Sequence, residues 1–121
     1  MAHEPEQDVM AARRREWDRQ SIYLRLQDGI PTAFWVWGDQ IAPLEPRPDL
    51  FAHEGGFGWG QQDATTQALA VAIVAKLVEV GLVAPEQQSA RAHYLHDEVL
   101  SKLPAGEHYD LHLSYLRLLL G

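Results

Sequence analysis

The residues of this chain best suited to chemistry lie in a glycine-rich stretch at 53–63, HEGGFGWGQQD. Glycines that lead into a helix can direct free backbone amides at a phosphate. The stretch lacks the Lys-Ser/Thr pair of a P-loop and the third glycine of a dinucleotide fingerprint, and the acidic Asp63 stands where an anion would bind. A nucleotide site is therefore disfavoured. The stretch is better interpreted as a short strand that packs Phe57 and Trp59 beneath the following helix.

Histidine spacing supplies a second candidate, because His93 and His96 are three residues apart on an expected helix. Two imidazoles on one helix face can share a metal ion, and Asp97 could accept a hydrogen bond from one of them. The chain has no cysteine, which excludes thiolate ligands, thiol catalysis and disulfides. We therefore expect solvated histidines and no metal or other cofactor, with a metal at His93 and His96 as the weaker alternative.

The sequence offers little support for a group of catalytic residues. No serine lies in a G-x-S-x-G nucleophile elbow. Glu54 and Asp63 flank the glycine stretch and could form an acid/base pair, but Asp63 is also well placed to be the N-cap of the next helix. We therefore expect a protein that is not an enzyme and has no catalytic residues.

Alternating side chains predict the strands that would position these residues. SIYLRL (21–26) and TAFWVWG (32–38) assign successive side chains to opposite faces on either side of an Asp-Gly turn, and QIAPL (40–44) can form a short third strand. On the second strand, Trp35 and Trp37 share one face. We expect the two rings either to close one edge of the core or to be presented to a partner.

Helical spacing dominates the second half of the chain. A helix over 64–81 is apolar on most of its circumference and is expected at the centre of the fold. A second helix is expected over 86–102, and a final amphipathic helix from about residue 111, although 108–112 could be extended. Strands followed by helices predict an α+β fold, with a small antiparallel sheet of about three to four strands packed against two to three helices.

The composition predicts a polar arm followed by one domain. Residues 1–19 are polar throughout and are expected to form a helical or flexible arm, whereas 20–121 suit a single α+β domain. The first ten residues lack the apolar core of a secretion signal. The most apolar stretch, 68–84, contains charged residues and is shorter than the roughly twenty residues of a membrane span. We expect a cytoplasmic protein without membrane contact.

The charge balance limits the classes of partner. The chain has 17 acidic and 10 basic residues, a net charge of -7, and its one basic run, Arg13–Arg15, is flanked by acidic residues. Such a surface repels phosphate backbones, so direct nucleic-acid binding is disfavoured, whereas a basic protein partner is favoured. The expected anchors are Trp35 and Trp37. The expected acidic rim consists of Asp39, Glu45, Asp49 and Glu54.

One segment resembles a known motif. FGWG followed by QALAVAIVAKLV resembles F-x-W-G-Y-G-G-S-G-P-x-x-L-A-L-A-I-L, the pattern of an uncharacterised family of short phage, plasmid and bacterial proteins. The matching residues are Phe57, Trp59, Gly60, Leu69, Ala70, Ala72 and Ile73. YLHDEVLSKLP and YDLHLSYLRLLL are similar to two later segments of that family, whereas residues 61–66 depart from its Y-G-G-S-G-P. The resemblance implies a shared fold over about 20–120 and an origin in a mobile genetic element.

These observations predict a non-enzymatic protein-binding module from a phage or mobile element. The specific hypothesis is an inhibitor of the anti-CRISPR kind, which occupies the basic nucleic-acid channel of a host defence effector. One alternative is a small-ligand-binding protein or minor enzyme that uses Phe57, Trp59, Gln61 and Asp63. The other is a homo-oligomeric structural protein, such as a homodimer, that buries Trp35 and Trp37 in a symmetric interface.

Overall fold

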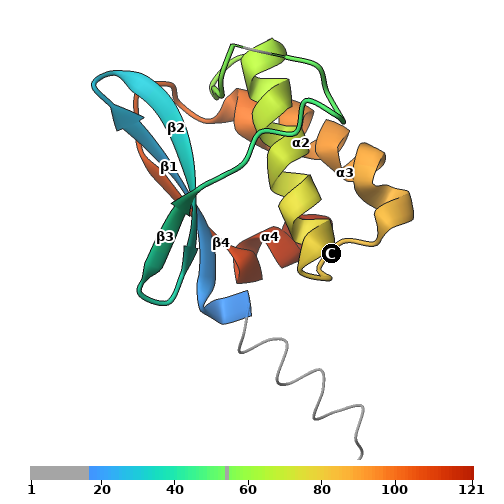
Figure 1. Ribbon diagram of the computed structural model, residues 1–121. Coiled ribbons are helices and arrows are strands. Elements are labelled where there is room, and N and C mark those ends of the chain that lie inside the picture. Colours follow the sequence, from blue (N-terminus) through green and yellow to red (C-terminus); the bar gives the residue numbers. More distant parts are fainter. Residues whose placement is uncertain (1–16, 54) are drawn as a thin grey trace, which may run out of the picture.

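The computed structural model describes residues 17–53 and 55–121, drawn in colour in Figure 1. Most of the expected arm, residues 1–16, and the expected rim residue Glu54 lie outside the described residues. Within the described part, one sheet forms a layer against which the helices pack (Figure 1). The predicted α+β class is confirmed.

The sheet is antiparallel and has the order β3-β2-β1-β4. Its strands are β1 (Gln20–Gln27), β2 (Ile30–Trp37), β3 (Gln40–Pro43) and β4 (Tyr109–His112). Asp28 and Gly29 both have positive φ in the turn between β1 and β2, as a tight hairpin turn requires. The extended alternative for the segment before the last helix is confirmed, because Tyr109–His112 pairs with β1.

Helix α2 (Ala64–Glu79) lies in the helical layer on one side of the sheet (Figure 1) and supplies much of the core, with Leu69, Ile73 and Leu77 fully buried. It ends slightly before the expected residue 81 because the chain turns at Gly81, whose φ is +81°. The amide of Leu82 donates to the Leu77 carbonyl at 2.8 Å, the closing bond of a Schellman motif. The central position predicted for this helix is confirmed.

The segment expected as one helix over 86–102 is instead built from four short pieces, and the prediction of a continuous α-helix is wrong. The pieces are the 3₁₀ turn η1 (Pro85–Gln87), α3 (Gln88–Tyr94), the π turn η2 (Leu95–Val99) and the 3₁₀ turn η3 (Leu100–Lys102). Leu95 and Leu100 are both fully buried. Five residues exceed one α-helical turn, so the wider π turn is needed to bring both leucines to the core side.

The glycine stretch does not form a strand, so that expectation is wrong. Its backbone bonds run to the helices: the amide of Gly60 donates to the Leu100 carbonyl at 2.8 Å, and that of Gly58 donates to Thr65 at 3.2 Å. The predicted packing of its rings is nevertheless confirmed, because Trp59 is buried and Phe57 packs against the same core.

Both ends of the described chain contribute to the core. The last helix, α4 (Leu113–Leu120), buries Leu113, Leu116 and Leu120, and it begins two residues after the expected start because β4 precedes it. Trp17, from the range assigned to the arm, is buried in the core cluster, with the Arg117 guanidinium 5.7 Å from its ring centre. None of the described helices has the length and apolarity needed to cross a bilayer.

Candidate interaction surface

The face of the sheet that points away from the helices carries a patch of apolar side chains. Figure 1 shows the described helices on one side of the sheet only. The patch consists of Tyr23, Ile30, Phe34, Val36 and Ile41, which we call the outer patch. All five alternate with the side chains that face the helices, and none of them packs against the helix-side core. Ile30 and Ile41 are exposed and the other three are half-buried, and apolar patches of this kind often mark interaction sites.

Cross-strand pairing joins four members of the outer patch, whereas Ile30 lies opposite Gln27 and is separated from Phe34 by Thr32 on the same strand. Tyr23 lies opposite Phe34, and Val36 lies opposite Ile41. These pairs bring side chains on neighbouring strands within contact distance. Ile30 and Ile41 are the most exposed members, at 63 % and 60 %.

Polar groups border the outer patch at β4. The Arg25 guanidinium lies 4.3 Å from the centre of the Tyr23 ring, donates to the Tyr109 carbonyl at 3.0 Å and forms an ion pair with Asp110. At the opposite edge, β3 is short and contains Pro43, which has no amide to donate. A partner is therefore better accommodated on the face of the sheet than as an added strand at this edge.

The structure separates the environments of the two tryptophans that were expected to act together. Trp35 is half-buried against the core, with the Lys76 ammonium 5.1 Å from its ring centre. Trp37 lies at the end of β2 and is 49 % exposed. It lines a shallow hollow together with Arg19 and Asp39. This end of the β2–β3 hairpin therefore combines an aromatic ring with one basic and one acidic side chain.

The expected acidic rim is distributed among different environments. Asp39 lies beside Trp37, whereas Glu45 is exposed just after β3. Asp49 is paired with Arg47 at 2.8 Å, and this side-chain hydrogen bond lowers the pKa of Asp49 and raises that of Arg47. Of the described rim residues, Asp39 is therefore the one that the structure brings together with an expected aromatic anchor.

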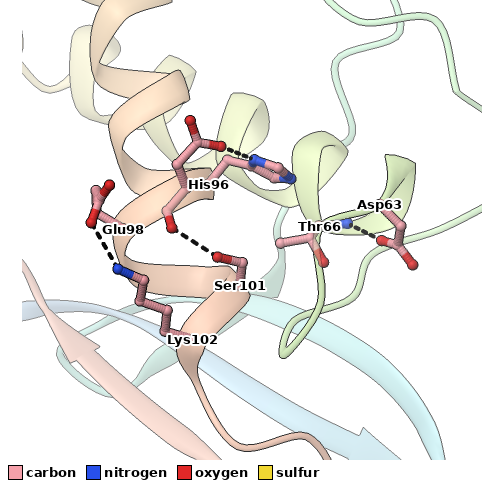
Figure 2. Close-up of polar contacts among 7 residues, drawn as sticks. Asp63, Thr66, His96, Glu98, Ser101 and Lys102 are labelled. Carbon is pink, nitrogen blue, oxygen red and sulfur yellow. Dashed lines mark hydrogen bonds and ion pairs between the residues drawn. The ribbon is translucent and has the colours of Figure 1, made fainter.

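Asp63 acts as the N-cap of α2, as predicted. Its carboxylate accepts a hydrogen bond from the Thr66 amide at 3.0 Å (Figure 2). It also accepts one from the Thr65 hydroxyl at 2.6 Å. The Thr65 hydroxyl is the main cause of a lowered pKa at Asp63, and the Thr66 amide adds to it. Gln61, its companion in the ligand-binding alternative, is exposed.

Replacing Asp63 by alanine is expected to lower the free energy of unfolding by about 1 kcal/mol at neutral pH, because the Thr66 amide and the Thr65 hydroxyl in the first turn of α2 lose their acceptor. The folded-state pKa of Asp63 is depressed, so its contribution is present above the unfolded pKa and is lost as the pH falls through the folded-state value, below 3.8. Urea unfolding of both proteins from pH 7 to pH 2.5 tests this, and a gap that stays constant over that range would contradict it.

The two histidines of the metal alternative lie on one cleft between α2 and the segment 85–96. The ring of His96 is held at Nδ1 by the Asp97 carboxylate, 2.7 Å away, so Asp97 is the acceptor that the spacing suggested. His93 is exposed at the same cleft. Among the described residues, no group of three or more metal-ligating side chains is brought together.

Sequence reasoning missed the outer patch, although its signal was present. The alternation on β2 separates Phe34 and Val36 from Trp35 and Trp37, but it does not say which pair the helices cover. In the structure they cover the side of Trp35. The signal that could have identified the exposed face is Ile41, which continues the row of Val36 on a strand too short to be internal.

Comparisons with known proteins identified no relative of this chain. No family model, no curated protein sequence and no solved structure matches the chain.

Proposed function

We propose that this protein is a non-enzymatic binding module whose outer patch docks on a partner protein. The observation that carries the proposal is the apolar row formed by half-buried Val36 and exposed Ile41 on the side of the sheet opposite the helices. Burial of such side chains is the main driving force of protein association, and aromatic rings such as Phe34 and Tyr23 are common anchors. Trp37 and Asp39 lie near the turn of the β2–β3 hairpin, at the end of the sheet, where they form a separate aromatic and acidic contact beside the outer patch.

The charge of the chain supports a basic partner. The net charge of -7 favours encounter with a positively charged surface and disfavours self-association. Exposed acidic residues at the hairpin and beyond it, Asp39 and Glu45, can occupy positions that such a surface offers to phosphates. Together with the resemblance to proteins of mobile elements, this favours a host defence effector that binds nucleic acid, of the CRISPR type, as the target.

The proposal can be tested with a matched pair of variants. The tagged protein captures its partner from host lysate, and the double variant Val36→Thr/Ile41→Thr is expected to reduce the captured amount at least about tenfold, because two anchors lose apolar area but keep a β-branched shape. Leu118→Gln is the control, since Leu118 is 84 % exposed on α4. The captured protein should be a basic nucleic-acid-binding protein, and excess heparin should release it.

Three results would contradict the proposal in different ways. Equal capture by the double variant and the control would exclude the outer patch as the docking surface. A partner that heparin does not release would exclude the nucleic-acid-binding effector. A concentration-dependent dimer in sedimentation analysis that the double variant abolishes would instead favour the homo-oligomeric alternative.

A further inference from the structure

We infer that the cleft between α2 and the segment 85–96 binds a small, partly aromatic compound that is uncharged or cationic. The cleft has a volume of about 430 Å³, within the range of small-molecule sites. It lies in the helical layer and shares no residue with the outer patch or with the hollow beside Trp37. The inference is therefore independent of the proposed docking function.

The walls of the cleft are largely apolar. The apolar lining residues are Leu50, Phe51, Val71, Pro85 and Ala92. Phe51 is fixed on two sides. Its ring stacks on that of His53 with centroids 6.1 Å apart, and its amide donates to the Arg47 carbonyl at 3.0 Å. A preformed aromatic wall favours a flat ligand, because little conformational freedom is lost when the ring is covered.

His96, which lines the cleft, lies in the π turn η2, and hydrogen bonds of this turn fix the orientation of its ring. Asp97 accepts the Nδ1 proton of His96, and its own backbone carbonyl accepts a hydrogen bond from the Ser101 hydroxyl at 2.9 Å (Figure 2). In the neutral ring, Nε2 is then an acceptor, and this buried atom has no partner among the described residues. His96 is itself a lining residue of the cleft, so the cleft borders a buried polar atom whose hydrogen bond is unmade, and a ligand N–H or O–H that reached it after a small side-chain shift would lower that cost. π turns often occur at functional sites.

Charge decides which ligands the cleft accepts. Among the described residues that line the cleft, Glu86 is the one carboxylate, and there is no lysine or arginine. An anionic ligand would be repelled by Glu86, and these described lining residues offer no permanent cation to compensate, whereas an amine would be attracted. Phe51 adds a ring face that stabilises a cation further.

Three indole compounds with the same ring and different charge test the inference. They are tryptamine, which is cationic, tryptophol, which is uncharged, and indole-3-acetate, which is anionic. Nuclear magnetic resonance titrations of the full-length protein are expected to shift the signals of Val71 and Ala92 with tryptamine and tryptophol, with a dissociation constant of about 1 mM or tighter. Indole-3-acetate is expected to bind about tenfold more weakly than tryptamine.

Two variants separate the cleft from other surfaces. Ser89→Phe places a bulky ring at an exposed lining position and is expected to abolish the shifts, whereas Ser114→Phe, at the equivalent second residue of α4, is expected to preserve them. Glu86→Gln is expected to weaken tryptamine binding about two- to fivefold. The inference is overturned if tryptamine and tryptophol shift no cleft signals, if the shifts persist in Ser89→Phe, or if indole-3-acetate binds as tightly as tryptamine.

Discussion

Replacement of Trp59 by alanine is expected to lower the free energy of unfolding by about 3–5 kcal/mol. The indole is only 4 % exposed and belongs to the same buried cluster as Leu69 and Leu100. Its removal leaves a cavity between the glycine stretch and the helices, which the surrounding backbone cannot fill. Urea unfolding followed by far-ultraviolet circular dichroism measures the change, since this signal does not depend on the tryptophan itself.

Trp37→Ala is the matched control, because it removes the same side chain from a half-exposed position. It is expected to cost less than about 1 kcal/mol. Similar unfolding midpoints for the two variants would show that Trp59 is not a core residue. The alternative in which the glycine stretch is a ligand-binding loop would then be favoured.

Gly60→Ala is expected to cost about 2–5 kcal/mol, the second large effect. Its φ of +86° strains any residue with a Cβ atom, and an added Cβ would lie 2.8 Å from the Leu103 carbonyl oxygen and 2.9 Å from Cβ of Ala105. The strain contributes about 1–2 kcal/mol, and the forced movement of the neighbouring segment adds about 1–3 kcal/mol. Loss of the hydrogen bond from Gly60 to Leu100 would accompany that movement.

Gly106→Ala separates the two contributions. Gly106 has a similar φ of +82°, but an added Cβ there meets nothing within 4 Å. We expect a cost of about 1–2 kcal/mol, from backbone strain alone. Thermal unfolding of both variants gives the comparison, and equal losses would mean that the contact of Gly60 with residues 103–105 carries no energy.

Local signals predicted the parts of the fold that depend on neighbouring residues. Asp63 caps α2 because its carboxylate reaches an amide three residues on, and Gly81 ends that helix because it adopts a positive φ. The spacing of Leu113, Leu116 and Leu120 likewise indicated the buried side of α4. Each of these rules involves residues within one or two turns of one another.

The candidate surface was only half predictable, because it depends on residues that are far apart in the sequence. Alternation assigned Phe34 and Trp35 to different faces of β2, but the choice of the covered face depends on where α2, far along the chain, packs. The cleft likewise depends on distant segments, because Phe51 and His96 line the same cleft only once α2, α3 and η2 are placed. The binding roles proposed for these residues, and the family resemblance, stay predictions.

By itself the sequence determined the elements of this protein: an antiparallel hairpin, a buried central helix with its cap and stop, and a glycine stretch whose rings turn inward. Tertiary structure alone decided that β4 closes the sheet beside β1, that a π turn lets both Leu95 and Leu100 reach the core, and that the outer patch faces away from the helices. The physical reason is the separation along the sequence over which each effect acts. Dihedral preferences and periodicity act between neighbours, whereas burial is settled by contacts between segments that the sequence keeps far apart.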